Sequence, residues 1–275
     1  MRLNAEQIER YSRQILLREM GGQGQQKLLS AKVLLVGLGG LGSPAALYLG
    51  AAGVGTLGLI DGEKVDRSNL QRQVLHNTED IGLAKVDSAC TKLSQLNPDL
   101  KLISYEEKLS SANALQILKN YDVIVDGSDN FPTRYLVNDA CVLLKKPNVF
   151  GSVLRFEGQV TLFAPTGPCY RCLFPRPPAP GTVPSCAEAG VLGTVAGVIG
   201  TLQANEVLKL LLELEPTLIG KLLLVDTLQL RFEEIFIKKN PNCSLCGANP
   251  TIAELIDYEE FCKSSSASNK KSQQQ

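Results

Sequence analysis

The sequence has a single histidine, no net charge and no apolar run long enough to cross a membrane. A hydrolase built on a Ser-His or Cys-His pair would depend on His76, and no serine or cysteine motif near it requires such a role. We therefore interpret His76 as an ordinary loop or core residue. Basic and acidic residues both total 28, so nothing indicates nucleic acid or an anionic membrane as a partner.

Two further absences concern membranes and export. The longest charge-free apolar run, 189–202, is shorter than the ~20 residues that span a bilayer, so we expect a buried core helix at 190–212. The polar N-terminal segment, Met1 to Arg10, lacks the apolar core of a signal peptide. Together these features predict a cytoplasmic protein without a membrane partner.

Helical and strand-like patterns alternate through the first half of the chain and predict an α/β fold. The expected elements are helices at 5–20, 78–97, 111–119 and 131–145, strands at 101–105 and 123–126, and a strand–helix–strand unit at 32–60. This alternation predicts a Rossmann-like, mostly parallel sheet with helices on both faces over residues 30–150. Residues 148–164 and 221–238 predict an antiparallel strand extension. The Ser-, Lys- and Gln-rich residues 263–275 are typical of a disordered tail.

A glycine-rich turn, Gly-Leu-Gly-Gly-Leu-Gly at residues 37–42, lies between the apolar run 33–36 and a helical stretch at 43–50. This strand, turn and helix context is the one that the dinucleotide-binding fingerprint requires. Glycines let the backbone approach phosphate, and the helix N-terminus offers unpaired N–H donors and a partial positive charge. Asp61 follows a second strand at 56–60, where a carboxylate can accept hydrogen bonds from ribose. The segment predicts a nucleotide site.

Three cationic residues, Arg67, Arg72 and Lys85, follow Asp61 in the chain. A nicotinamide dinucleotide has only a pyrophosphate, which the helix N-terminus largely satisfies. ATP under attack at its α-phosphate needs additional positive charge where negative charge develops. The cations therefore favour a triphosphate, although each of them alone is also consistent with a solvated loop residue.

The strand at 123–126 is followed by Gly127-Ser128-Asp129-Asn130, at the carboxyl edge where α/β proteins bind ligands. We favour Asp129 as the ligand of a magnesium ion that bridges ATP phosphates, because carboxylate and phosphate oxygens suit that hard cation. Asp126 is the alternative, but it still belongs to the strand end. Turn formation or capping of the next helix would explain either carboxylate without a metal.

Eight cysteines in a cytoplasmic chain indicate metal ligands or reactive thiols rather than disulfides. Four of them form two Cys-x-x-Cys pairs, Cys169 with Cys172 and Cys243 with Cys246. Two such pairs complete a closed four-thiolate set, which is the structural form of zinc site. The spacer between the pairs is long, so two separate redox or buried pairs are the alternative. Proline and glycine beside both pairs favour turn-borne metal ligands.

These motifs together resemble one known family. The glycine turn, the run Arg67–Gln73, Lys85, Asp129-Asn130, the run Arg155–Gln159 and both cysteine pairs closely resemble the MoeB/ThiF/HesA adenylyltransferases, bacterial relatives of ubiquitin-activating enzymes. The resemblance implies that ATP is used to adenylate the C-terminal glycine carboxylate of a small ubiquitin-fold sulfur-carrier protein, which ends in Gly-Gly. Pyrophosphate is released. It also implies a homodimer with a structural zinc in each subunit.

On this resemblance, residues 1–250 form the adenylyltransferase unit and residues 251–275 an extension that is disordered from about 263. The unit divides into a nucleotide-binding core at about 30–150 and an antiparallel, zinc- and carrier-binding part at about 151–250. The implied nucleotide-binding residues are Gly37, Gly39, Gly40, Gly42, Asp61, Ser68, Asn69, Arg72, Lys85, Asp129 and Asn130.

The resemblance also implies catalytic roles. Asn69, Arg72 and Lys85 would contact the triphosphate, Asp129 would carry the magnesium, and Arg13 matches an arginine that the family passes into the partner subunit's site. A carboxylate is already an anionic nucleophile at neutral pH. The reaction therefore needs charge neutralisation and in-line positioning but no general base.

Cys186 follows the proline-rich stretch 175–184 and is expected on a loop crossing the nucleotide site. A cysteine here is implicated in sulfur transfer in thiamin-pathway relatives but is not thought essential in molybdopterin-pathway relatives, so a reactive and an inert thiol both stay open. Longer relatives append a rhodanese-like domain, which this chain is too short to contain, so a separate sulfur donor protein is expected. The carrier and its pathway, molybdopterin, thiamin or another, stay open.

Two other function classes share part of the pattern. A nicotinamide-dependent oxidoreductase would have the glycine turn and Asp61 but would not explain the cations or the cysteine pairs. A non-catalytic scaffold that binds a ubiquitin-fold partner would not need an intact Arg72, Lys85 and Asp129.

Overall fold

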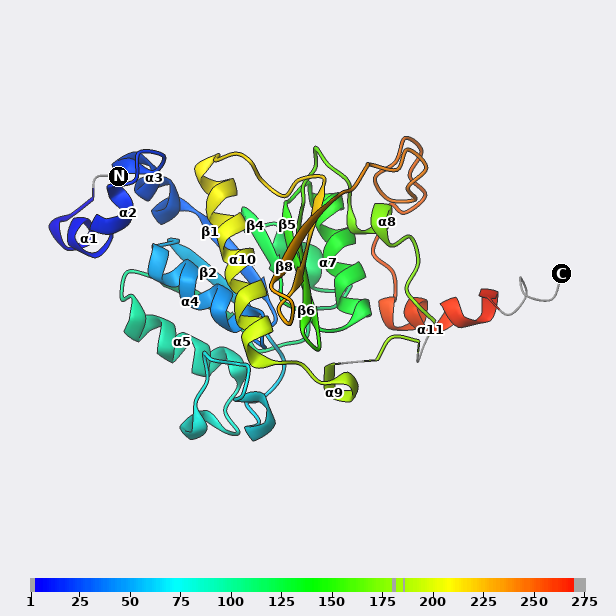
Figure 1. Ribbon diagram of the computed structural model, residues 1–275, viewed down its shortest axis with the longest axis horizontal. Coiled ribbons are helices and arrows are strands. Elements are labelled where there is room, and N and C mark those ends of the chain that lie inside the picture. The colour runs from blue at the N-terminus through cyan, green and yellow to red at the C-terminus, as the bar shows by residue number, and fades with distance from the viewer. Residues whose placement is uncertain (1–2, 180–181, 185, 270–275) are drawn as a thin grey trace.

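One eight-stranded sheet, in the order β3-β2-β1-β4-β5-β6-β7-β8, forms the centre of the protein (Figure 1). The structure is a computed structural model and describes residues 3–179, 182–184 and 186–269. The strands are β1 (Lys32–Val36), β2 (Thr56–Ile60), β3 (Lys101–Tyr105), β4 (Val123–Asp126), β5 (Asn148–Leu154), β6 (Glu157–Phe163), β7 (Lys221–Asp226) and β8 (Arg231–Phe236). The pairings from β3 to β5 are parallel and those from β5 to β8 are antiparallel. The predicted mostly parallel sheet with an antiparallel extension is confirmed.

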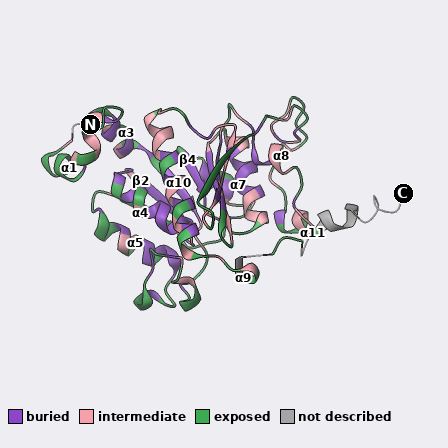
Figure 2. Ribbon diagram, in the orientation of Figure 1, coloured by how far each residue is buried: buried purple, intermediate pink, exposed green. Residues whose placement is uncertain are grey.

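Helices cover both faces of this sheet. One apolar cluster joins the sheet to α4 (Gly42–Ala52), α5 (Lys85–Leu96) and α10 (Gly193–Leu212). A second joins the opposite face to α6 (Ala114–Leu118), α7 (Phe131–Leu144) and α11 (Tyr258–Asn269). In β1, Val33 and Leu35 enter the first cluster and Leu34 and Val36 the second, because successive side chains of a strand point to opposite faces. Figure 2 shows the resulting buried centre, with β8 exposed along its length.

By length and composition alone, α10 is long and apolar enough to span a membrane. Its buried residues nevertheless pack against α4, β5 and β6, across the front of the sheet in Figure 1. A core helix of a globular domain can be equally long and apolar, and α10 packs as the buried helix expected at 190–212.

Three local expectations differ from the structure, and one helix was not expected. The helix expected at 5–20 is two short helices, α1 (Ala5–Arg10) and α2 (Ser12–Ile15), and the next helix, α3 (Gly21–Ser30), was not expected. The helix expected at 78–97 starts at Lys85, and residues 78–80 form a separate 3₁₀ turn capped by Asn77. The tail expected from about residue 263 begins as the second half of α11. Residues 270–275 lie outside the described residues.

Candidate functional site

A cavity of about 470 Å³ opens at the carboxyl ends of β1, β2 and β4. The chain runs outward from β1 to β3 and then returns to place β4 on the other side of β1, so β1 and β4 form a topological switch point, where open α/β sheets bind ligands. Nine of the predicted nucleotide-binding residues line this cavity: Gly37, Gly39, Gly40, Asp61, Asn69, Arg72, Lys85, Asp129 and Asn130. Ser68, Gly42 and Arg67 are not among its lining residues.

The glycine turn wraps tightly between β1 and α4. Gly37 has φ of +88°, a conformation that favours glycine. A Cβ on Gly42 would lie 1.9 Å from the Gly37 carbonyl oxygen, so Gly42 closes the turn rather than lining the cavity. The Asp61 carboxylate accepts hydrogen bonds from the backbone N–H groups of Leu38 and Glu63, both at 2.8 Å. These bonds fix the predicted ribose acceptor against the turn.

Lys85 and Arg72 bring positive charge to the cavity wall. The Lys85 side chain is only 3% exposed, and its Nζ lies 2.6 Å from an oxygen of Glu63, whose own side chain is 77% exposed. Lys85 is also the first residue of α5, where the helix N-terminus adds a partial positive charge. Arg72 donates from Nη1 to the Ser68 carbonyl at 3.1 Å. The Ser68 hydroxyl instead donates to the Asp66 carboxylate at 2.6 Å, and Asp66 caps the 3₁₀ turn η1 (Arg67–Asn69) to which Ser68 belongs.

The two candidate magnesium carboxylates occupy different surroundings. Asp126 is buried, and one of its oxygens accepts from the backbone and hydroxyl of Ser128; burial raises the pKa of its carboxyl group. Asp129 is exposed and lines the cavity, so its carboxylate, unlike that of Asp126, is accessible from the cavity. The Asn130 side chain accepts from the Thr133 N–H at 2.9 Å and caps α7, so Asn130 contributes to the cavity from the first turn of a helix.

Sequence reasoning missed several lining residues, among them Glu63, Gln73, Lys108 and Arg134. Lys108 and Arg134 add two cations to Arg72 and Lys85, and the Arg134 guanidinium lies over the rings of Phe131 and Phe150. The helical spacing in the sequence could have revealed Arg134. Arg134 follows Asn130 by one helical turn, so it shares the face of α7 that begins at the predicted ligand edge.

Arg13 lies away from the cavity of its own chain. Its neighbour Gln14 donates from Nε2 to the Ala52 carbonyl at 2.8 Å, at the carboxyl end of α4. The glycine turn precedes the opposite end of this 11-residue helix, which spans about 16 Å.

Cys186 begins α9 (Cys186–Ala189), and its side chain lies outside the described part of the chain. The segment that follows α9 reaches the cavity at Val191.

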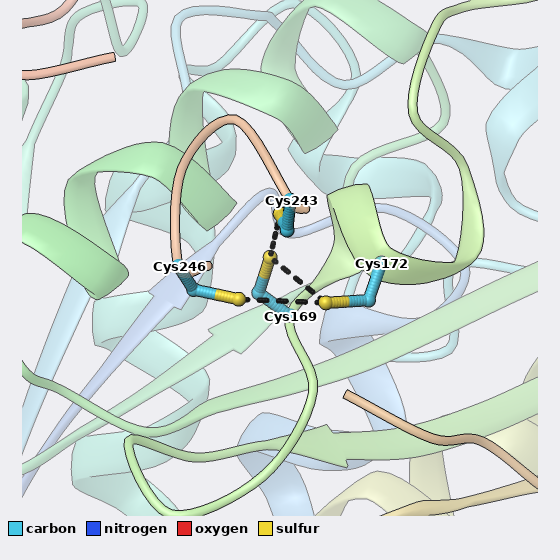
Figure 3. Close-up of side chains that lie close together, drawn as sticks. All are labelled: Cys169, Cys172, Cys243 and Cys246. Atoms are coloured by element: carbon cyan, nitrogen blue, oxygen red, sulfur yellow. Dashed lines mark hydrogen bonds between the residues drawn. The ribbon is translucent and has the colours of Figure 1, made fainter. Parts of the chain in front are cut away.

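The four predicted cysteine ligands meet at one point (Figure 3). Their sulfur atoms all lie within 4.8 Å of one another, with 3.9 Å for Cys169–Cys172, 3.7 Å for Cys169–Cys243 and 3.4 Å for Cys172–Cys246. The long spacer thus does not keep the pairs apart. Burial and the neighbouring thiols raise the pKa of Cys169, so thiolates gathered here require a compensating cation. The Asn240 backbone N–H also donates to the Cys172 sulfur.

A buried ion pair attaches this cluster to the rest of the fold. Arg171, between the two cysteines of the first pair, donates from Nε and Nη2 to both oxygens of Asp139 on α7, at 2.8 and 2.7 Å. The Tyr258 hydroxyl of α11 donates to the same carboxylate at 2.7 Å. Since both charges are buried and paired, the cysteine cluster is fixed to the helix whose first turn borders the cavity.

The comparisons with known proteins agree with this geometry. Residues 11–245 match the ThiF family. A Thermus thermophilus protein named sulfur carrier protein adenylyltransferase is 53% identical over 268 residues, which is 95% of this chain and 99% of that protein. The Sus scrofa adenylyltransferase and sulfurtransferase MOCS3 is 54% identical over 265 residues, which is 96% of this chain and 58% of that protein.

Solved structures show the same fold. A crystal structure of E. coli MccB with MccA-N7isoASN superposes with a TM-score of 0.78 at 24% identity, over 86% of this chain and 74% of that one. The extent of the family match and the identity to the Thermus protein place the sequence without ambiguity. The chain belongs to the ThiF family.

Proposed function

We propose that this protein uses ATP to adenylate the C-terminal glycine carboxylate of a ubiquitin-fold sulfur-carrier protein ending in Gly-Gly, with release of pyrophosphate. The observation that carries the proposal is one cavity at the switch point that gathers Asp61, Arg72, Lys85 and Asp129. The name of the Thermus relative, sulfur carrier protein adenylyltransferase, supports the substrate class. The molybdopterin, thiamin or another thiolation pathway is consistent with this chemistry.

The proposed reaction depends on positioning and charge. Asp61 is oriented to accept from ribose hydroxyls, and Gly39 and Gly40 leave the backbone open to phosphate. Arg72 and Lys85 stabilise the negative charge that develops as the carboxylate attacks the α-phosphorus. A magnesium ion would bridge phosphate oxygens there, and the exposed carboxylate of Asp129 offers the oxygen ligand it prefers.

A second hollow provides a route for the carrier's C-terminal tail. It is about 370 Å³, lies along β5 to β8 and shares Val153 with the nucleotide cavity. Beside it, the edge strand β8 exposes Ile235 on the face of Arg231 and Glu233, which line the hollow, and exposes Phe232 and Phe236 on its other face, the last with 76% of its surface accessible. Exposed apolar patches mark binding surfaces, so we propose that the carrier docks here. Phe236→Ser should raise the KM for the carrier and leave the KM for ATP unchanged. A variant whose KM for the carrier equals that of the wild type would contradict this docking site.

We propose that the protein acts as a homodimer whose subunits complete each other's sites. In its own chain, Arg13 lies beyond the far end of α4 from the glycine turn. The same region exposes Leu16, Leu17 and Tyr48, which a symmetric partner would cover. A guanidinium delivered across such an interface would act on the triphosphate as an arginine finger.

We propose that the cysteine cluster holds a structural zinc ion. Zinc bound tetrahedrally to thiolates at ~2.3 Å separates the sulfur atoms by about 3.8 Å. The sulfur pairs of 3.4 to 3.9 Å fit this arrangement. Four thiolates leave no open position, so the metal would stabilise the fold rather than take part in the reaction.

Adenylation activates the carrier but supplies no sulfur, so we propose that a separate protein donates the sulfur. We also propose a cytoplasmic location. Cys186 precedes a segment that reaches the cavity at Val191, which would suit a thiol that acts on the activated carboxylate.

Pyrophosphate exchange tests the proposed function. Labelled pyrophosphate should enter ATP only when a carrier with a free Gly-Gly carboxylate is present, and a panel of such carriers should identify the preferred one. Exchange without any carrier, or none with every carrier tested, would contradict the proposal. Tight binding of NADH in a fluorescence titration would favour an oxidoreductase.

A further inference from the structure

His76, the only histidine of the chain, is buried beside the nucleotide cavity without lining it. Its Nε2 lies 3.1 Å from the Leu38 carbonyl oxygen and its Nδ1 lies 2.8 Å from the Ser88 hydroxyl. Leu38 belongs to the glycine turn, and Ser88 lies one helical turn after Lys85 in α5. The imidazole therefore connects the two elements that supply the phosphate-binding groups.

The partners of His76 determine its tautomer. A carbonyl oxygen only accepts hydrogen bonds, so Nε2 carries the proton and donates to Leu38. Nδ1 then accepts from the Ser88 hydroxyl, for whose single proton the Asp80 carboxylate is a second acceptor. A neutral ring satisfies both bonds. Burial lowers the pKa of His76, the Leu38 carbonyl raises it, nearby Lys85 lowers it, and Asp80 and Asp61 raise it, with a net lowering.

Residue Leu38 is held through both of the peptide groups that it joins. Its N–H donates to the Asp61 carboxylate at 2.8 Å, and its carbonyl accepts from His76 and from the Ser43 hydroxyl at 3.2 Å. Rotation of these two peptide groups would move Gly37 and Gly39, which flank Leu38 and line the cavity. The position of the phosphate-binding turn relative to Asp61 thus depends on the bond that His76 donates.

We propose that His76 is a positioning residue of the nucleotide site, which as a neutral Nε2–H imidazole fixes the Leu38 carbonyl and with it the glycine turn against Asp61 and α5. This inference rests on the proposed use of ATP. His76 does not line the cavity and acts through its bonds to Leu38 and Ser88, so its loss should weaken nucleotide binding more than it alters the overall fold.

Two substitutions separate positioning from packing. Gln carries its amide nitrogen about as far from the backbone as Nε2 and can donate to Leu38, whereas the shorter Asn reaches only the position of Nδ1. His76→Asn should raise the KM for ATP by about tenfold in pyrophosphate exchange, the usual effect of one lost hydrogen bond. His76→Gln should stay within about threefold of the wild type. The KM for the carrier should change little in either variant.

Asn97→Ala is the matched control. Asn97 is buried and donates to Gly50 and to the Tyr11 hydroxyl, at the opposite end of α4 from the glycine turn. This variant should lower thermal stability without changing the KM for ATP. If His76→Asn also changes only stability, or if His76→Gln is as impaired as His76→Asn, the proposal is wrong.

Nitrogen-15 NMR of the wild-type protein gives a readout that does not depend on any variant folding. A single histidine yields one pair of ring-nitrogen signals, which should report a neutral Nε2–H tautomer at neutral pH and should shift when ATP is added. An Nδ1–H tautomer, or signals unmoved by bound ATP, would overturn the proposal. A wild-type protein that binds no ATP would instead overturn the proposed function, and the positioning role with it.

Discussion

Replacing Lys85 with methionine should separate catalysis from stability. The Lys85 side chain is 3% exposed, so methionine fills nearly the same buried space and removes only the charge. Its partner Glu63 is left solvated rather than buried, because 77% of that side chain is exposed. We therefore expect the free energy of unfolding to change by no more than ~1 kcal/mol. Loss of a preorganised cation at the developing phosphate charge should lower exchange by ~10²-fold or more, equivalent to ~2.7 kcal/mol of transition-state stabilisation.

Carrier-dependent pyrophosphate exchange, measured beside a thermal unfolding curve, checks this expectation. Lys92→Met is the control for loss of charge on the same helix, because Lys92 pairs with Asp80 at 3.2 Å and does not line the cavity; since the Asp80 side chain is only 8% exposed, this control should lower stability more than Lys85→Met does. The control should keep near wild-type exchange. Near wild-type exchange by Lys85→Met would refute the assignment, and an equal loss in both variants would show that α5 tolerates no change of charge.

Three further predictions concern the metal, the subunits and pH. Metal analysis should find about one zinc per chain, and Cys172→Ser or Cys246→Ser should lower the melting temperature; metal-free protein with unchanged melting in both variants would exclude a structural site. Arg13→Ala and Asp129→Ala homodimers should both be inactive, yet mixing them should restore exchange, since one pocket of a heterodimer has both residues intact. Demonstrated heterodimers without activity would place Arg13 in its own subunit's pocket. The pKa of His76 is lowered on folding, so the unfolded chain binds more protons than the folded chain just below pH ~6.5. The free energy of unfolding should therefore decrease as the pH drops below ~6.5. His76→Gln lacks that titration, and a parallel loss of its stability would contradict the assignment.

The parallel core could be predicted from the sequence because its apolar strands and the glycine-rich turn at residues 37–42 are local sequence features. The run 33–36, the turn after it and Asp61 follow one another with the spacing that a β-α-β unit requires, and the structure places them so. The helix α3 was missed because Gly21, Gly22 and Gly24 are poor helix formers. Tertiary packing overrides that preference: Leu28 and Met20 of this region bury against α10.

The site was predicted only where a motif marked it. Asp61, Arg72 and Lys85 follow a recognisable turn, whereas Glu63 and Lys108 reach the cavity from loops whose course depends on the fold. Ser68 was expected at the nucleotide, but its hydroxyl donates to Asp66, the residue that caps η1. No local pattern indicates that the two cysteine pairs meet, since the hairpin of β7 and β8 and helix α10 intervene.

The role of His76 could not be predicted either, because no local motif marks it. A lone histidine at that position is consistent with an ordinary core residue. Its two bonds to Leu38 and Ser88 depend on the approach of segments that are separated in the sequence.

The transfer of AMP to a carrier carboxylate is the central claim, and isotope-labelled carrier tests it directly. A Gly-Gly-ended carrier with oxygen-18 in its C-terminal carboxylate should gain the mass of one adenylyl group when incubated with the protein and MgATP. Hydroxylamine capture of the activated carrier should then release AMP that contains one labelled oxygen, because the attacking carboxylate oxygen bridges to phosphorus. Unlabelled AMP, or an equal mass gain on a carrier whose C-terminus is amidated, would contradict the account.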